Sequence, residues 1–206
     1  MRRLSLSTVA LILALSTRSA LAQQLTKGGP ITNLPAPVLM DTTGMFQDRY
    51  ARLGDDIFIG GQPTEKALRE MKAQGVTTVI NLRTPEEMKR SVKFDEPALI
   101  QSLGMRYVYI PMRGNAEFPY SPEAVAKLAS AVKSANGKVL LHCTVAWRAS
   151  HLWAAYLIKE RGVPVQTALA NARAINLMDT MRMGPGRQPV EDFLDRTLPE
   201  IGHPPK

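Results

Sequence analysis

One cysteine in this chain of 206 residues is followed by an arginine five positions later, within the stretch "HCTVAWR" at residues 142–148. A thiolate is a nucleophile, and a guanidinium offers a planar fork of donors to two oxygens of an anion. The preceding "KVLLH", residues 138–142, is typical of a buried strand, and residues 148–162 are typical of a helix. A loop between a strand and a helix directs main-chain N–H groups and the helix dipole at one point. The pattern predicts that Cys143 attacks an oxyanion held by Arg148 and the loop.

The loop residues between these two are expected to line the binding site, and they are Thr144, Val145, Ala146 and Trp147. His142 and Ser150, on either side of the loop, are expected to support it through hydrogen bonds. Because Cys143 is the only cysteine, it forms no disulfide within the chain. A buried inert thiol and an intermolecular bridge are the alternatives to a reactive thiol.

Hydrolysis of an ester with a poor leaving group needs a general acid that protonates the leaving oxygen. An aspartate upstream of the cysteine would be the usual donor, but the sequence has none between Asp95 and Asp179. The loop expected at residues 112–121 carries Glu117, which we expect to act as the general acid when the loop closes over the substrate. Arg113 in the same loop is expected to recruit the anion. The alternative is that both are only solvated loop residues.

Strand and helix patterns alternate along most of the chain. Apolar and β-branched stretches predict strands at residues 56–61, 76–82, 105–111 and 138–142. Capped amphipathic stretches predict helices at residues 63–75, 94–104, 121–137 and 148–162. The alternation predicts an α/β fold with a mainly parallel central sheet of four to five strands and helices on both faces. Ligands of such sheets bind beyond the carboxyl ends of the strands, which is where Cys143 lies.

Three segments are predicted along the chain. Residues 1–22 have a basic start, a short apolar stretch and a small-residue end, and they indicate a signal peptide rather than an uncleaved anchor. Residues 23–52 contain several prolines and little periodicity, so an extended arm is expected, followed by one catalytic domain at residues 53–200. The protein is therefore expected to be exported, periplasmic or secreted, with no stable membrane insertion after cleavage of the signal.

The net charge of +8 falls to +5 once the three arginines of residues 1–22 are removed. The other basic residues are scattered, without a stripe interleaved with aromatic side chains, so no nucleic-acid partner is expected. Three histidines and one cysteine show no metal-ligand spacing, so neither a metal nor another cofactor is expected. The expected partner is an anionic substrate, a phosphoester or a sulfur anion.

The stretch "HCTVAWR" after a buried strand resembles the signature loop of cysteine-dependent phosphatases. Residues 58–87, "FIGGQPTEKALREMKAQGVTTVINLRTPEE", are similar to the start of bacterial dual-specificity-like phosphatase domains. The resemblance covers residues 53–180 and looks closest to the bacterial beta-lactamase-hydrolase-like or sulfur-transferase/phosphatase branch. It implies a phosphatase fold and hydrolysis of a phosphomonoester, on protein tyrosine or a small molecule, through a phosphocysteine.

The sequence departs from the common phosphatase pattern in three ways. Four residues rather than five separate Cys143 from Arg148. Ala146 stands where these loops often have glycine, so it would be strained if the loop needs a positive φ there. Ala149 follows the arginine where a serine or threonine is usual. Two alternatives to the phosphatase are therefore considered, a persulfide sulfurtransferase that uses the same cysteine and a non-catalytic module that binds an anion or a phosphoprotein.

Overall fold

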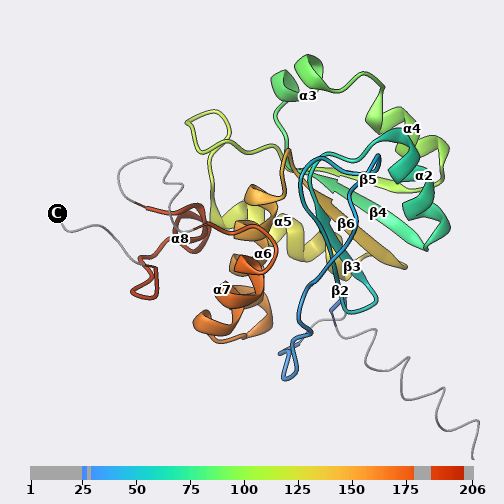
Figure 1. Cartoon of the computed structure of the whole chain (residues 1–206). Coiled ribbons are helices and arrows are strands. Elements are labelled where there is room, and N and C mark those ends of the chain that lie inside the picture. Colours follow the sequence, from blue (N-terminus) through green and yellow to red (C-terminus); the bar gives the residue numbers. More distant parts are fainter. Residues whose placement is uncertain (1–24, 27–28, 179–186, 202–206) are drawn as a thin grey trace, which may run out of the picture.

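The computed structural model describes residues 25–26, 29–178 and 187–201, and these form a six-stranded sheet between two layers of helices (Figure 1). The strands in chain order are β1 (Val38–Leu39), β2 (Tyr50–Leu53), β3 (Ile57–Gly60), β4 (Val76–Asn81), β5 (Arg106–Tyr109) and β6 (Lys138–His142). Their order across the sheet is β1-β2-β3-β6-β4-β5. The pairs β3–β6, β6–β4 and β4–β5 are parallel, whereas β1–β2 and β2–β3 are antiparallel.

The predicted α/β class with a mainly parallel centre and helices on both faces is confirmed. The sheet has six strands rather than four to five, because residues that we assigned to the extended arm supply β1 and most of β2. These short strands carry no extended alternating pattern. Pairing of β2 with β3 and of β1 with β2, rather than local propensity, holds them in the sheet. The expected domain boundary between residues 52 and 53 falls inside β2.

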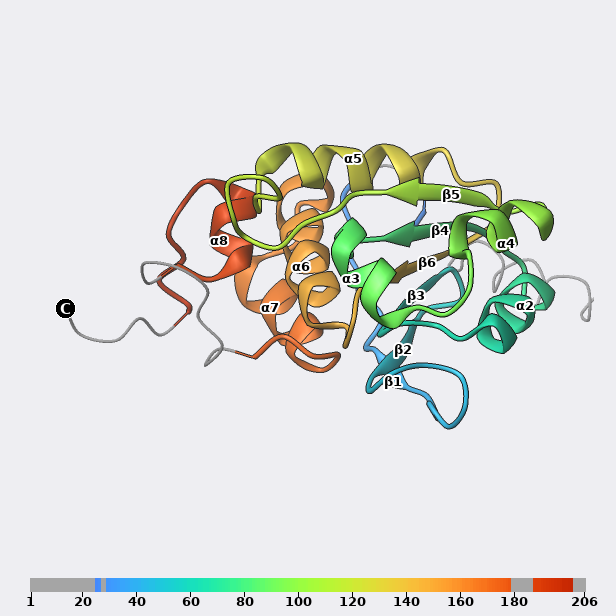
Figure 2. The same ribbon diagram turned by 90° about the horizontal axis from the view of Figure 1, so that it is seen from above.

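Alternation of side chains along the strands divides the core into two layers. In β3, Ile57 and Ile59 belong to the larger cluster, and Phe58 between them belongs to the smaller one. The larger layer is covered by α5 (Pro122–Lys133), α6 (Trp147–Arg161), α7 (Val165–Arg173) and α8 (Pro189–Leu194). The smaller layer is covered by α2 (Glu65–Ala73) and α4 (Glu96–Ser102), and α3 (Pro85–Ser91) lies at the carboxyl end of β4. Figure 2 shows α6 and α7 on the opposite side of the sheet from α2.

The segment before β1 packs on the domain. Leu25 and Ile31 are buried in the larger core cluster. Arg161, at the end of α6, donates to the carbonyl oxygen of Leu25 at 2.5 Å and to that of Gly29 at 2.8 Å. The signal peptide predicted at residues 1–22 lies outside the described residues. Among the helices of the described ranges, none is both long and apolar enough to cross a membrane.

Helix α6 buries a histidine without a polar partner. His151 has no exposed surface, and neither of its ring nitrogens has a hydrogen-bond partner among the described residues. Its ring meets that of Trp147 edge to face, with 4.7 Å between the centroids. Burial lowers the pKa of His151 from 6.5 to about 3, because the charged form is excluded from the apolar layer.

We expect His151→Phe to reduce the loss of stability in acid. Below pH 6.5 the unfolded chain binds a proton at His151, whereas His151 of the native protein stays neutral until the pH falls to about 3. Acid therefore favours unfolding. Between these values the residue contributes a slope of at most about 1.4 kcal/mol per pH unit, which phenylalanine removes. Urea unfolding of both proteins from pH 7 to pH 4 measures the slopes. Parallel curves for the two proteins would contradict the assignment.

Candidate active site

The loop that follows β6 is held by main-chain contacts with the loop that follows β3. Gly61 bridges Val145, and the N–H of Gln62 donates to the carbonyl oxygen of Thr144 at 2.9 Å. A Cβ at Gly61 would lie 1.7 Å from the carbonyl oxygen of Gln47 and 2.7 Å from that of Thr144. Only glycine permits this approach, so the "GQPT" turn fixes the position of the cysteine loop.

Ala146 adopts the left-handed conformation, with φ 66° and ψ −5°, and ends the loop where α6 begins. The positive φ that would strain an alanine at this position is therefore present. The side chain of Asn176 donates to the carbonyl oxygen of Val145 at 2.5 Å, and the hydroxyl of Ser150 donates to that of Ala146 at 2.8 Å. Both side chains hold the loop backbone, and in this structure the Ser150 hydroxyl is directed at a carbonyl rather than at the thiol.

This backbone leaves several N–H groups free for an anion. Within the described ranges, the N–H groups of Thr144, Val145, Trp147 and Arg148 donate to no main-chain oxygen. Trp147 and Arg148 lie in the first turn of α6, where N–H groups have no partner inside the helix. These donors and the helix dipole create a positive potential beside Cys143.

Arg148 is held by a carboxylate that the sequence analysis did not identify as part of the site. Its Nη1 donates to Oε2 of Glu87 at 2.8 Å and to the carbonyl oxygen of Met112 at 2.7 Å. Its Nη2 donates to Oε1 of Glu87 at 2.7 Å and to Oγ1 of Thr144 at 3.0 Å. The four Nη hydrogens are thereby occupied, and Nε–H is the guanidinium donor without a hydrogen bond to a described residue. Glu87 acts as a positioning residue for Arg148.

The start of α3 explains why Glu87 is in place. Thr84 caps the helix, its side chain accepting from the N–H of Glu87, while the carboxylate of Glu87 accepts from the N–H of Thr84 at 2.9 Å. This reciprocal capping box is visible in the sequence as "TPEE". Burial raises the pKa of Glu87, but the hydrogen bonds from Arg148 and from Thr84 outweigh it and lower the pKa to about 2. The carboxylate is therefore ionised at neutral pH.

His142 lies beneath the loop in a buried polar cluster. Its Nε2 lies 3.2 Å from Oε1 of Glu96, and both side chains are fully buried. Glu96 also accepts from the side chains of Gln62 at 2.5 Å and Asn81 at 2.8 Å. Burial raises the pKa of Glu96, and His142 and the two amides together lower it below its usual value. The cluster ties β6 to α4 and to the "GQPT" turn.

A pocket of about 260 Å³ opens beside the cysteine, and its lining residues are Glu87, Arg113, Tyr120, Cys143, Thr144, Val145, Trp147 and Arg148. The cysteine is 1% exposed and therefore lies at the floor of the pocket. The half-exposed Arg113 places Nη1 3.9 Å from Oε1 of Glu87. Most of the residues that the sequence predicted for the site thus line this pocket. Ala146 does not line it and contributes through the conformation of the loop backbone.

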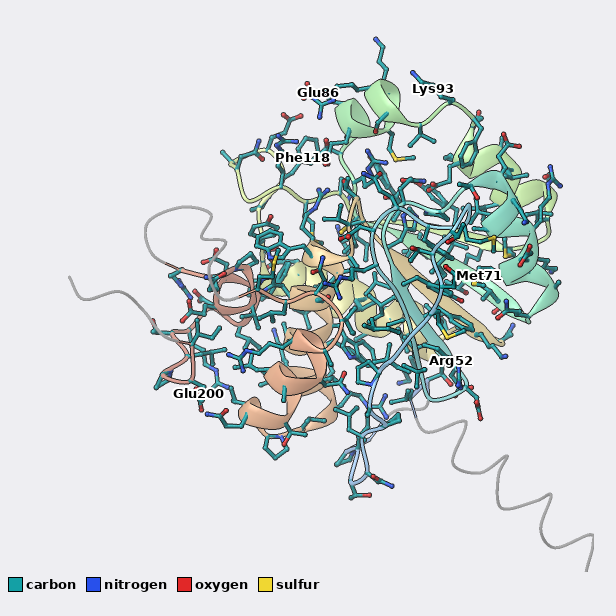
Figure 3. All side chains as sticks on the ribbon, viewed as in Figure 1. Arg52, Met71, Glu86, Lys93, Phe118 and Glu200 are labelled. Atoms are coloured by element: carbon teal, nitrogen blue, oxygen red, sulfur yellow. The ribbon has the colours of Figure 1, made fainter. Side chains whose placement is uncertain are left out.

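Glu117 is not brought into this pocket. The loop before α5 closes on itself, because the N–H groups of Arg113 and Gly114 both donate to the carbonyl oxygen of Phe118 at 2.8 Å. Glu117 is exposed and does not line the pocket, and Figure 3 shows Phe118 on this outer loop. Tyr120, which no sequence pattern indicated, occupies the pocket wall instead.

Arg83 lies two residues after the end of β4. Its position predicts an ion pair with Glu86 or Glu87. In the structure it is buried and donates to Gln62 Oε1 at 2.6 Å, to the carbonyl oxygen of Glu87 at 3.2 Å and to the hydroxyl of Ser91. These hydrogen bonds brace the backbone of α3, and the charge of Arg83 is also attracted by Glu87 and Glu96. No cluster of three histidine, cysteine or acidic side chains suited to a metal occurs among the residues with described positions.

Comparison with family models decides the relationship. Residues 50–158 match the model described as "Beta-lactamase hydrolase-like protein, phosphatase-like domain", which is just over half of the chain. The chain belongs to this family. The match spans β2 to α6 and therefore includes Glu87, Tyr120, Cys143 and Arg148. A search of curated proteins finds no match.

Solved structures share the fold of this phosphatase-like chain. PTPMT1 in complex with PI(5)P has a TM-score of 0.57 at 16% identity, covering 71% of this chain and 92% of PTPMT1. TpbA of P. aeruginosa in complex with pTyr has a TM-score of 0.51 at 16% identity, covering 69% of this chain and 80% of TpbA. At these identities the likeness concerns the fold. The chain is thus a cysteine-dependent phosphatase-like protein of the beta-lactamase-hydrolase-like branch.

We expect Ala146→Gly to stabilise the protein. Glycine removes the cost of the left-handed conformation for alanine, about 1–2 kcal/mol. Part of this gain is lost, because glycine increases the conformational entropy of the unfolded chain. The free energy of unfolding should rise by about 0.5–1 kcal/mol. Denaturant unfolding measures it. Ala170→Gly, on the exposed face of α7, is the control and should lower the same quantity. Destabilisation by both changes would contradict a strained Ala146.

We expect Glu87→Gln to destabilise the protein by about 3 kcal/mol at pH 7, because it leaves the buried Arg148 without its carboxylate. The pKa of Glu87 is depressed, so its stabilisation is present in full above pH 4.5 and is lost as the pH falls toward about 2. The difference between the two proteins should therefore shrink in acid. Denaturant unfolding at pH 7 and pH 3 measures it.

Glu86→Gln is the matched control, since Glu86 is exposed on the same helix and Figure 3 shows it pointing outward. It should change the free energy of unfolding by less than about 0.5 kcal/mol. Equal effects of the two substitutions would contradict the role assigned to Glu87.

Proposed function

We propose that the protein is a cysteine-dependent phosphatase that hydrolyses a phosphomonoester through a phosphocysteine. The observation that carries the proposal is that Cys143 and Arg148 line one pocket together with loop residues whose N–H groups donate to no main-chain oxygen. Membership of the phosphatase-like family and the pTyr complex of the structurally similar TpbA support it. The substrate class is a phosphomonoester of protein tyrosine or of a small molecule.

In the first step the sulfur of Cys143 attacks phosphorus, the S–P bond forms, and the bond from phosphorus to the leaving oxygen breaks. That oxygen takes up a proton and departs as an alcohol or phenol. In the second step water attacks phosphorus, the S–P bond breaks, and phosphate and the thiolate are released. The loop N–H groups and Nε–H of Arg148 stabilise the charge on the phosphoryl oxygens in both steps.

Persulfide transfer is the second candidate, and the short loop favours it. Four residues between the cysteine and the arginine make a smaller ring of donors, and Glu117 does not reach the pocket. With thiosulfate, Cys143 would attack the outer sulfur, the S–S bond would break, and sulfite would leave without needing a strong acid.

The proposal also includes the location of the protein. Residues 1–22 indicate a signal peptide, so we propose that the protein is exported to the periplasm or secreted.

We expect the protein lacking residues 1–22 to hydrolyse p-nitrophenyl phosphate and Cys143→Ser to lose at least about 1,000-fold in kcat/KM, because serine is the weaker nucleophile at neutral pH. Steady-state kinetics measures both rates. Phosphate or vanadate should slow alkylation of Cys143 by iodoacetamide, since both occupy the same donors. Equal hydrolysis by the two proteins would reject the phosphatase.

The same preparations separate the alternatives. A one-sulfur adduct at Cys143 after incubation with thiosulfate, seen by mass spectrometry without phosphatase turnover, would favour sulfur transfer. Binding of phosphate without turnover or adduct, with slow alkylation at neutral pH, would favour a non-catalytic module.

A further inference from the structure

The pocket needs a proton donor that none of its charged residues can supply. Glu87 is ionised and paired with Arg148, and the hydroxyl of Thr144 is engaged with both of them. Arg113 and Arg148 are cations that keep their protons at neutral pH. Among the lining residues, Tyr120 is the remaining side chain with an ionisable O–H group, and the thiol of Cys143 is the nucleophile.

The position of Tyr120 is fixed by packing on both sides. The residue is 7% exposed, and its ring meets that of Phe193 edge to face with 5.2 Å between the centroids. On the other side, a Cβ at Gly114 would lie 2.5 Å from Cε2 of the tyrosine ring. Gly114 has φ 79°, and the Phe118 carbonyl holds its N–H at 2.8 Å. The loop that carries Glu117 therefore packs against the ring of Tyr120 and fixes its position.

The hydroxyl of Tyr120 is buried and has no hydrogen-bond partner among the described residues. A buried hydroxyl without a partner costs free energy, so this group is costly unless a ligand accepts from it. Tyr120 lines the same pocket as Cys143 and Arg148, so the phenol lies beside the nucleophile and the anion site.

We propose that Tyr120 donates the proton to the oxygen of the leaving group, in the role that the sequence suggested for Glu117. The inference rests on the proposed phosphatase activity. As the bond between phosphorus and the leaving oxygen breaks, the phenolic O–H bond breaks with it, and the proton passes to that oxygen. The tyrosinate so formed takes a proton from the water that attacks the phosphocysteine in the second step, which restores the phenol.

The electrostatics of the pocket suit this role. Burial raises the pKa of Tyr120 to about 12, so the hydroxyl keeps its proton across the physiological range. A donor of that strength transfers its proton usefully only to a basic oxygen, such as that of an unactivated phenol or an alcohol. The residue therefore matters most for substrates with poor leaving groups.

The test is the dependence of kcat/KM on the leaving group for wild type and Tyr120→Phe, using aryl phosphates from 2,4-dinitrophenyl to phenyl phosphate. We expect Tyr120→Phe to lose about 100-fold on phenyl phosphate, in keeping with general acid catalysis, and less than about threefold on the dinitrophenyl ester. Inhibition by inorganic phosphate should stay within about twofold, because the oxyanion donors are untouched. A residue with only a structural role would lower all the rates together.

Three variants complete the design. Tyr50 is another buried tyrosine with a pKa raised to about 12, and it lies outside this pocket. Tyr50→Phe should therefore leave the dependence of kcat/KM on the leaving group unchanged. Gly114→Ala keeps the hydroxyl but displaces the ring, so it should reproduce the selective loss on phenyl phosphate if Tyr120→Phe fails to fold. Glu117→Gln tests the rival donor.

The outcomes are distinct. A selective loss in Tyr120→Phe, absent in Glu117→Gln, supports the inference. Turnover that depends on Cys143, with parallel leaving-group series for wild type and Tyr120→Phe, overturns the role of Tyr120 and leaves the phosphatase standing. The absence of turnover that depends on Cys143 in the wild type overturns both. A selective loss in Glu117→Gln alone assigns the proton to the outer loop and overturns the inference.

Discussion

The pairing of Arg148 with Glu87 is the interaction on which the site depends. Two hydrogen bonds of 2.7 and 2.8 Å fix the plane of the guanidinium, and they connect the start of α6 to the start of α3. A guanidinium buried without a carboxylate would incur the full cost of its desolvation. The carboxylate uses the Nη side of the arginine and leaves Nε–H for an anion. The same pair therefore supports the fold and orients the donor.

The loop around the cysteine is shaped from outside by segments distant in sequence. The loop backbone is engaged by Gly61 after β3, Asn176 after α7 and Ser150 in α6, and none of these contacts occupies the N–H groups of Thr144 and Val145. The conformation includes a left-handed Ala146, which is not favoured locally. Such strain persists only where the surroundings determine the backbone, and three independent contacts provide that here.

Sequence reasoning identified the parts of the site that lie within one contiguous stretch. Cys143 and Arg148 share a loop, and their types and spacing limit the chemistry they can do. Glu87 carried a signal in its capping box, but a capping glutamate is usually solvated, and only its burial against Arg148 marks it as part of the site. Tyr120 had no signal, because its place depends on contacts with Gly114 and Phe193 across two loops. The first two strands were missed for the same reason, since β2 forms by pairing with β3 and β1 by pairing with β2.

The charges of the pocket show how a dianion can bind beside a thiolate. Among the lining side chains, Arg113 and Arg148 each contribute one positive charge, and Glu87 contributes one negative charge. Arg113 and Nε–H of Arg148 attract a phosphoryl group, and the dipoles of the free N–H groups and of α6 add to that attraction. These dipoles are fixed by the backbone and do not titrate. Selectivity then depends on the neutral groups of the wall, among which the unpaired hydroxyl of Tyr120 is the one able to give up a proton.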